Sequence, residues 1–266
     1  MVYLEDILSF LRGSFPEELK EDWDNVGLMV GDEGQSINKV LVTLDVTCDT
    51  VCEAKSFGAE LIISHHPLIF KPVKSITEDA GTGTMLRELI KNDISVYSMH
   101  TNFDKASGGM NDLLADKIGL SSVREYYPEE LFASDGTPID NIGRVGTLDT
   151  PMTLDDFADF VKVSLGSTAI KVFGNGSETV KTVALCTGSG GSMLSAAYNS
   201  GADVYLTSDL GHHHAQSASE LGLNLIDAGH FETENIITQY LYDVLSCEFP
   251  DLLIKKSEAV PFYRSV

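Results

Sequence analysis

The feature of this chain that most limits its fold is an internal repeat. Residues 39–64 and 181–207 each contain a strand-like apolar run, a turn, a helix-like stretch with alanines, a Gly-Ala-acid tripeptide and a second short apolar run. The distance from the first lysine to the glycine is 19 residues in one copy (39 to 58) and 20 in the other (181 to 201). Similarity at this scale indicates duplicated supersecondary units. The alternative is a chance likeness between two ordinary strand-helix-strand units.

A shared polar pattern downstream of each copy argues against chance. A strand-like run leads into a histidine that is followed four positions later by a carboxylate, as His100 and Asp104 in the first half and as His230 and Glu234 in the second. If these segments are helical, the two side chains of each pair lie on one helix face. The repeat therefore includes candidate functional residues as well as the pattern of strands and helices.

The alternation of strand-like and helix-like stretches predicts an α/β fold with a largely parallel sheet. We expect two similar α/β lobes related by an approximate twofold axis, with a metal site in the cleft between them. The loop-rich stretch 122–142 marks the boundary, so the lobes are predicted at 1–125 and 126–266, with exchange of terminal elements allowed. The expected elements are strands at Val40–Leu44, Leu61–Ile63, Ile94–Met99 and Ala169–Phe173, and helices at Thr50–Phe57, Met85–Lys91 and Met110–Ile118, with another starting at Thr153.

Charge and hydropathy exclude several classes of partner. Among 266 residues, 18 are Lys or Arg and 40 are Asp or Glu, which gives a net charge of −22. Such a surface repels phosphate backbones, so we expect no nucleic acid partner. No apolar run approaches the ~18 residues of a membrane span, and the N-terminus lacks the basic region and cleavage site of a signal peptide. We therefore expect a cytoplasmic protein without membrane contact.

The histidines are the candidate functional residues. All seven fall at or just after predicted strand ends, where open α/β sheets usually bind ligands. His65 and His66 are adjacent, and neighbouring side chains in extended chain point opposite ways, so both can serve only at a turn or on two metals. The alternative is one ligand and one packing histidine. For the triplet at 212–214, a solvent-facing loop and a role near the site both remain open.

The spacing gives a donor set of three imidazoles and two carboxylates. This set is too small for two separate open metal sites, but it suits a two-metal centre with a bridging carboxylate, and such centres mostly serve hydrolysis. His100 or a member of the triplet, His213, would then move protons, and a histidine can also orient a ligand from outside the metal's coordination shell. Asp209 takes the place of His66 in the second half, so we expect it near the site. The predicted metal ligands are His65, His66, Asp104, His230 and Glu234.

Five segments resemble the GTP cyclohydrolase 1 type 2 homologue family, also called Nif-three-like. They span nearly the whole chain in the family's order, and together they are specific. One departure is Thr-Ser-Asp at 207–209, where the family usually has Thr-Gly-Asp, and this puts a role for Ser208 and Asp209 in doubt. The segments are Trp23 to Gly31 (WDNVGLMVG), Ile63 to Pro67 (ISHHP), His100 to Asp104 (HTNFD), Thr207 to Asp209 (TSD) and Asp227 to Glu234 (DAGHFETE).

The resemblance implies a two-lobed subunit of the short form, without the domain that some members insert between the lobes. It also implies two divalent metal ions per subunit, such as zinc, iron or manganese, held by the five residues named above, and a toroidal homohexamer. Some members are described as opening the imidazole ring of GTP. Two functions are therefore expected: a metal-dependent hydrolase of a nucleotide-like substrate, or a non-enzymatic, ring-shaped metal-binding scaffold or regulatory partner protein.

Overall fold

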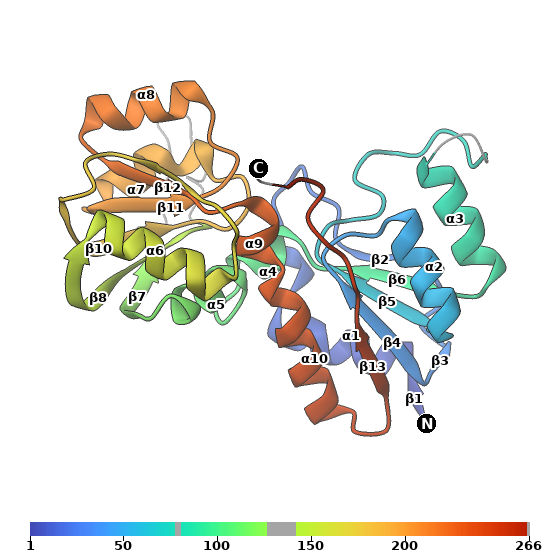
Figure 1. Ribbon diagram of the computed structural model, residues 1–266. Helices are drawn as coiled ribbons and strands as arrows, with labels where there is room; N and C mark the ends of the chain where they lie inside the picture. Colours follow the sequence, from blue (N-terminus) through green and yellow to red (C-terminus); the bar gives the residue numbers. More distant parts are fainter. Residues whose placement is uncertain (78–80, 127–141, 265–266) are drawn as a thin grey trace. The chain divides into compact units, whose positions relative to one another are not determined.

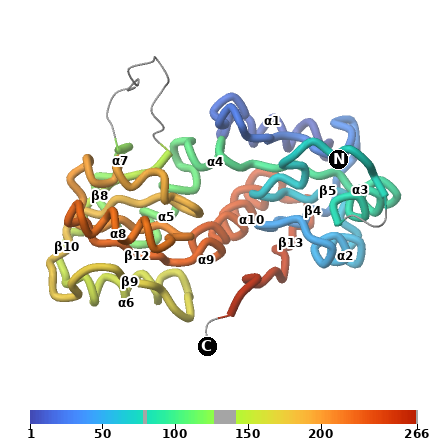
Figure 2. The backbone as a smooth tube through the Cα atoms, turned by 90° about the horizontal axis from the view of Figure 1, so that it is seen from above, coloured from blue at the N-terminus to red at the C-terminus, as the bar shows by residue number. Residues whose placement is uncertain are grey.

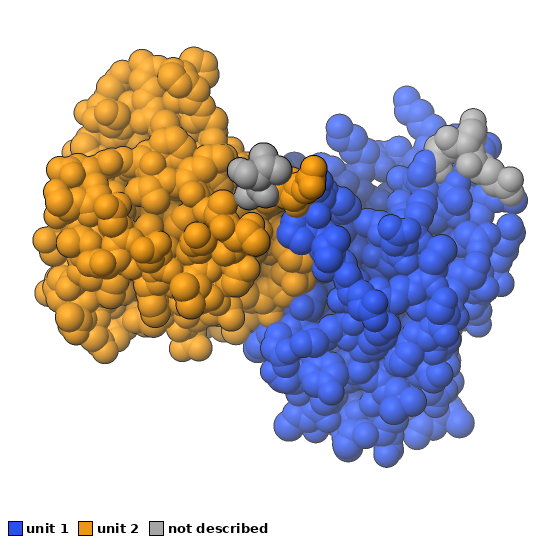
Figure 3. Space-filling model, viewed as in Figure 1, with its two compact units in different colours: residues 1–106, 237–262 blue, residues 107–236, 263–266 orange. Residues whose placement is uncertain are grey.

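The computed structural model describes residues 1–77, 81–126 and 142–264, and the chain in it divides into two compact units. The first unit comprises residues 1–106 and 237–262, and the second comprises residues 107–236 and 263–266 (Figure 3). Each unit has a central sheet covered by helices on both faces (Figure 1). The predicted α/β class is therefore confirmed.

The first unit is built on a five-stranded sheet in the order β13-β4-β5-β6-β2. The strands β13, β4, β5 and β6 are parallel, and β2 runs antiparallel to β6 at one edge. Residues 40–42 and 61–63 are fully buried, as continuous apolar strands are when helices cover both faces. The elements are β1 (Val2–Tyr3), α1 (Leu4–Ser14), a 3-10 turn (Glu17–Leu19), β2 (Gly27–Val30), β3 (Ser36–Ile37), β4 (Lys39–Thr43), α2 (Cys48–Phe57), β5 (Leu61–Ser64), α3 (Gly81–Lys91), β6 (Ser95–Ser98), α4 (Thr101–Lys105), α10 (Ile236–Glu248) and β13 (Leu253–Lys256).

Two pairs of helices enclose this sheet. Helices α2 and α3 pack on the face that carries Leu41, Ile62 and Val96. On the other face, the guanidinium of Arg12 in α1 lies 5.9 Å from the ring of Tyr97 in β6. Helix α10 packs beside α1, and the chain enters it directly from α9 (Figure 2).

The second unit contains a six-stranded sheet in the order β7-β8-β10-β11-β12-β9. Strands β10, β11 and β12 are parallel, whereas β8 and β9 run antiparallel to their neighbours. Helices α5 and α6 cover one face, and α7 and α8 cover the other. The elements are α5 (Met110–Lys117), β7 (Leu120–Glu125), β8 (Arg144–Thr153), α6 (Leu154–Leu165), β9 (Lys171–Phe173), β10 (Thr179–Leu185), a 3-10 turn (Gly191–Met193), α7 (Leu194–Asn199), β11 (Val204–Thr207), α8 (His212–Leu221), β12 (Asn224–Asp227) and α9 (His230–Glu234).

The two units share one topology in their parallel cores. The first runs β4-α2-β5-α3-β6-α4 and the second runs β10-α7-β11-α8-β12-α9. In each unit an antiparallel strand pairs with the last parallel strand of this core: β2 pairs with β6, and β9 pairs with β12. The short helix that follows β6 or β12 carries the acidic residue of the repeated pattern. The twofold axis and the cleft concern the placement of one unit against the other, and they stay predictions.

Two segments lie outside a simple division of the chain at residue 125, and the C-terminal one is an exchange of the kind that the prediction allowed. Residues 107–125 belong to the second unit because β7 pairs with β8, and residues 237–262 belong to the first because β13 pairs with β4. The pairing of β13 with β4 joins segments far apart in the sequence, so local patterns do not reveal it. Strand β7 pairs with the next strand of the chain, β8, across the stretch predicted as the boundary. Most of the loop-rich stretch proposed as the boundary lies outside the described residues.

None of the helices in the described ranges combines the length and the hydropathy that a bilayer span requires.

The cap of α6 gives a test of the local structure. The hydroxyl of Thr153 accepts a hydrogen bond from the Asp156 amide at 3.1 Å, as its spacing predicts. We expect Thr153→Ala to lower the free energy of unfolding by about 1 kcal/mol, because the amide loses this partner. Urea unfolding followed by circular dichroism measures the change. The exposed Thr168, beyond the end of the helix, provides the control Thr168→Ala, and an equal loss in both variants would contradict the assignment.

Candidate functional site

The candidate residues of the first unit follow the carboxyl ends of neighbouring parallel strands. His65 and His66 come directly after β5, and His100 comes two residues after the end of β6. Because β5 and β6 pair in parallel, their carboxyl ends lie at the same edge of the sheet. The topology therefore brings the three imidazoles to one place.

The three imidazoles form a compact cluster. Ring centroids lie 5.1 Å apart for His65 and His66, 5.1 Å for His65 and His100, and 5.6 Å for His66 and His100. One ring nitrogen of each lies within 4.8 Å of those of the others. In an extended chain the side chains of His65 and His66 would point in opposite directions. The chain bends at these two residues, so both imidazoles can lie in the same cluster.

A carboxylate completes this cluster. Asp104 in α4 is buried, and its Oδ1 lies 3.6 Å from Nε2 of the fully buried His65. We call His65, His66, His100 and Asp104 the histidine cluster. It combines nitrogen and oxygen donors, which borderline divalent metals such as zinc prefer.

Hydrogen bonds fix the orientation of every ring in the histidine cluster. Nδ1 of His65 lies 2.7 Å from the Met99 carbonyl oxygen, and Nδ1 of His66 lies 2.8 Å from Oδ1 of Asp45. Nδ1 of His100 lies 2.8 Å from Oδ1 of Asp24.

The identity of these partners decides the tautomer. A carbonyl or carboxylate oxygen can only accept, so Nδ1 carries the proton and donates. In the neutral imidazole the lone pair is then on Nε2, the nitrogen left to bind a metal or a proton.

The second unit repeats this arrangement at the end of β12. Gly229, with a φ of 90°, turns the chain into α9, where His230 and Glu234 lie one turn apart. Nε2 of His230 is 2.9 Å from Oε2 of Glu234, and Nδ1 of His230 is 2.7 Å from Oδ2 of Asp209. We call His230 and Glu234 the α9 pair.

Carboxylates surround the imidazole of His230 on both sides. Burial by itself lowers the pKa of His230, but hydrogen bonds and charge from Glu234 and Asp209 raise it to about 9. A divalent cation at Nε2 would relieve the same concentration of negative charge that otherwise holds a proton. Asp209 lies beside His230, as expected from its position, and its carboxylate fixes the orientation of that ring.

Gly188 leaves room for the α9 pair, and sequence reasoning did not identify it. It has a φ of 59°, and a Cβ there would lie 2.0 Å from Oε1 of Glu234 and 3.3 Å from Nε2 of His230. A side chain at this position would therefore collide with the donor atoms.

The donor chemistry fits divalent metal ions in both units. Of the five predicted ligands, the structure brings His65, His66 and Asp104 together in the first unit and His230 and Glu234 together in the second. Each donor is an imidazole nitrogen or a carboxylate oxygen, and each imidazole has its Nδ1 anchored, as metal-binding histidines usually do. Their role as ligands, and one centre shared by both units, stay predictions.

The histidine triplet opens α8 and does not lie in a loop. His212 and His213 are exposed, with ring centroids 5.6 Å apart, and Nδ1 of His214 accepts a hydrogen bond from the Gly211 amide. A proton-transfer role for His213 stays a prediction. The same role for His100, whose ring is held by Asp24, also stays a prediction.

Sequence reasoning assigned no role to Asp24 and Asp45, which orient two of the rings. Asp24 belongs to the segment Trp23 to Gly31, so the resemblance drew attention to it without a function. Asp45 lies two residues after β4, at the strand end where such residues gather. Its position at a strand end was therefore the sequence feature that could have identified Asp45 as a candidate site residue.

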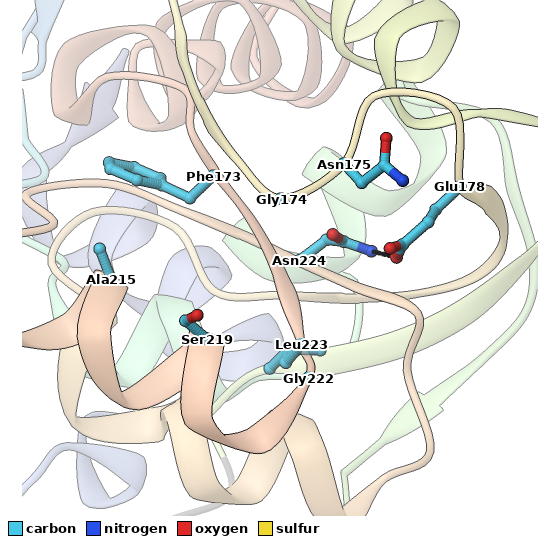
Figure 4. Close-up of a pocket in the computed structure, with 9 residues that line it drawn as sticks. All are labelled: Phe173, Gly174, Asn175, Glu178, Ala215, Ser219, Gly222, Leu223 and Asn224. Atoms are coloured by element: carbon cyan, nitrogen blue, oxygen red, sulfur yellow. Dashed lines mark hydrogen bonds between the residues drawn. The ribbon is translucent and has the colours of Figure 1, made fainter.

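Two cavities of the second unit differ in their relation to the α9 pair. One of about 390 Å³ is lined by His230, Asp209 and Lys171, among others, at the carboxyl end of β12. The other, about 200 Å³ in volume, adjoins Asn224 at the amino end of the same strand, where Asn224 donates to Glu178 (Figure 4). Because ligands bind beyond the carboxyl ends of parallel strands, the first cavity is the candidate ligand pocket.

Known proteins resemble this chain over nearly its whole length. The family model described as Duf34/NIF3 (NGG1p interacting factor 3) matches residues 2–261. A protein of Clostridium perfringens named "GTP cyclohydrolase 1 type 2 homolog" is 40% identical over 234 residues, which cover 87% of this chain and 86% of that protein. A Streptomyces coelicolor protein of the same name is 37% identical over 237 residues, covering 88% and 82%.

Solved structures share the fold. A Bacillus cereus protein related to NIF3 superposes with a TM-score of 0.89 at 28% identity, covering 100% of this chain and 99% of that one. Reduced HcgD from Methanocaldococcus jannaschii superposes with a TM-score of 0.82 at 30% identity, covering 97% and 98%.

A substitution of Asp24, whose carboxylate orients His100, tests how the histidine cluster is held in place. Burial alone raises the pKa of Asp24, but hydrogen bonds from His100 and Thr101 hold it well below its usual range. We expect Asp24→Asn to lower the free energy of unfolding by about 1–3 kcal/mol, because an amide cannot accept at both oxygen positions. Urea unfolding measures the loss. Asp22→Asn, at an exposed neighbour, is the control, and equal stabilities of the two variants would contradict this role.

Proposed function

Because this chain belongs to the Duf34/NIF3 (NGG1p interacting factor 3) family, we propose that it binds two divalent metal ions per subunit and hydrolyses a nucleotide-like substrate. The proposed ligands are the five residues predicted from sequence, so the histidine cluster and the α9 pair contribute to one centre. The metals are ions that accept nitrogen and oxygen donors, such as zinc, iron or manganese.

One observation carries the proposal: four histidines at strand ends have Nδ1 engaged by an oxygen acceptor. These are His65, His66, His100 and His230. A histidine that merely packs in a core needs no common tautomer with three others. The shared pattern, with carboxylates of Asp104 and Glu234 facing Nε2 in each unit, is the arrangement that supports metal binding.

In the proposed hydrolysis the metal ions and the side chains of the protein have different roles. Divalent ions, when bound, supply Lewis acidity and generate a nucleophile from water at neutral pH. His65 and His66 hold their donor nitrogens in fixed directions, and Asp104 and Glu234 balance positive charge. His100, oriented by Asp24, accepts the proton released from water or delivers one to the leaving group. His213 is the second candidate for that proton transfer.

The substrate and the assembly are further parts of the proposal. The names of the similar proteins of C. perfringens and S. coelicolor point to GTP cyclohydrolase chemistry, so a guanine nucleotide is the first substrate to assay. A toroidal homohexamer is the proposed assembly. The family description names an interacting factor, which favours the second candidate function, a metal-binding scaffold for a protein partner.

Elemental analysis tests the metal centre. We expect the purified protein to carry two divalent ions per chain. His66→Ala and Glu234→Gln should each lose most of the metal if the ions share ligands from both units, because each variant removes a donor from the shared centre. His213→Ala, at an exposed histidine of α8, is the matched control and should keep wild-type metal content.

Two other results would change the conclusion. Retention of full metal content in both ligand variants would show that these residues are not ligands. A metal-loaded protein that hydrolyses no member of a nucleotide panel, and whose rate is unchanged in His65→Ala, would replace the hydrolase with the scaffold.

A further inference from the structure

Two aromatic side chains of the first unit are exposed beside the histidine cluster. Trp23 is 61% exposed and Phe70 is 47% exposed, although both belong to the residue types that proteins prefer to bury. Exposed aromatic groups beside a polar site are typical of surfaces that bind a ligand. We call Trp23 and Phe70 the aromatic pair.

The aromatic pair contacts His100 directly. Ring centroids lie 6.2 Å apart for Trp23 and His100, and 6.3 Å apart for Phe70 and His100. Trp23 and Phe70 lie 6.0 Å from each other with their planes at 70°. The two rings therefore border the same imidazole, and both side chains are partly exposed. Because their planes lie at 70°, a flat ring that stacks on one of them meets the other at an angle.

The aromatic pair is held in position by groups that adjoin the histidine cluster. Trp23 precedes Asp24, which is buried and binds His100. The side chain of Asn25 donates to the carbonyl of Ile69 at 2.6 Å, which ties the segment of Trp23 to that of Phe70. Because the segments of both aromatic residues are held by these hydrogen bonds, a ligand that binds there does not have to order the two side chains first.

We propose that Trp23 and Phe70 form a stacking platform for a planar nitrogen heterocycle of the substrate, and that this platform presents the ring to His100. The inference rests on the proposed function and names the part of the substrate that the first unit recognises. Stacking on aromatic side chains accepts any flat ring, so the platform selects for planarity. Polar groups beside it, such as His100, then distinguish one heterocycle from another.

A second copy of this chain is the competing occupant of the aromatic pair. Val73 and Ile76, on the same segment as Phe70, are also exposed. A protein interface over the aromatic pair would cover His100 and close the proposed site, so contact with the histidine favours a small ligand. The experiment below separates the two occupants.

Trp23 makes the test direct, because it is the only tryptophan in the chain. The metal-loaded protein is titrated with guanosine, cytidine and pterin, with ribose as the non-aromatic control, while tryptophan fluorescence is recorded. We expect saturable quenching by at least one ring compound and none by ribose. The absence of saturable quenching by all three ring compounds would overturn the proposal.

Variants at Phe70 show whether the quenching comes from the platform. Phe70→Leu should weaken the binding of the ring compound about tenfold, since stacking is lost while apolar volume is kept. Phe70→Tyr should restore binding. Phe160→Leu removes an aromatic ring of similar exposure (41%) from α6 of the second unit and should bind as the wild type does.

Metal content and sedimentation velocity, measured on each variant, separate the remaining outcomes. A protein that keeps its metal but binds rings equally well with Leu or Phe at position 70 contradicts the platform and leaves the proposed function standing. A wild-type protein without metal contradicts the proposed function itself. If Phe70→Leu changes the oligomeric state and leaves ring binding unchanged, the aromatic pair is an interface between copies of this chain.

Discussion

The candidate site depends on one kind of interaction, the hydrogen bond from a histidine Nδ1 to an oxygen that can only accept. It recurs at His65, His66, His100 and His230, with the Met99 carbonyl and three different carboxylates as acceptors. Each bond sets a ring direction and a tautomer together. Without it, an imidazole at a strand end could rotate and present either nitrogen, and the donor set would lose its geometry.

The two units use the same scaffold unequally. In both, a parallel three-stranded core ends in a short helix that bears an acidic residue facing an imidazole, Asp104 in one and Glu234 in the other. After the middle strand, however, the first unit has His65 and His66 where the second has Ser208 and Asp209. Asp209 orients His230, so the second unit uses this position to orient a histidine. Three of the four anchored histidines therefore belong to the first unit.

The elements that the sequence predicts well are those set by local patterns. The strands expected around Val40–Leu44 and Leu61–Ile63 are present as β4 and β5, because runs of buried apolar residues of this length are typical of parallel strands. The cap at Thr153 and the helix that begins at His230 are also local, since they depend on neighbours within one turn. The assignment of residues 237–262 to the first unit depends on the pairing of β13 with β4, which lie near opposite ends of the chain, and no local window contains it. Residues 107–125 join the second unit because β7 pairs with β8 across the loop-rich stretch predicted as the boundary.

The sequence by itself determined the α/β class, the duplicated core and the residue types of the candidate site, because hydrophobic periodicity and the repeated histidine-to-acid spacing are properties of the chain. Only the tertiary structure decided which nitrogen each histidine presents, that Asp24 and Asp45 orient the rings, and that Gly188 leaves space beside Glu234. These features require contacts between residues that are distant in sequence. They arise when parallel strands bring their carboxyl ends to one edge of a sheet, and spacing alone does not contain them.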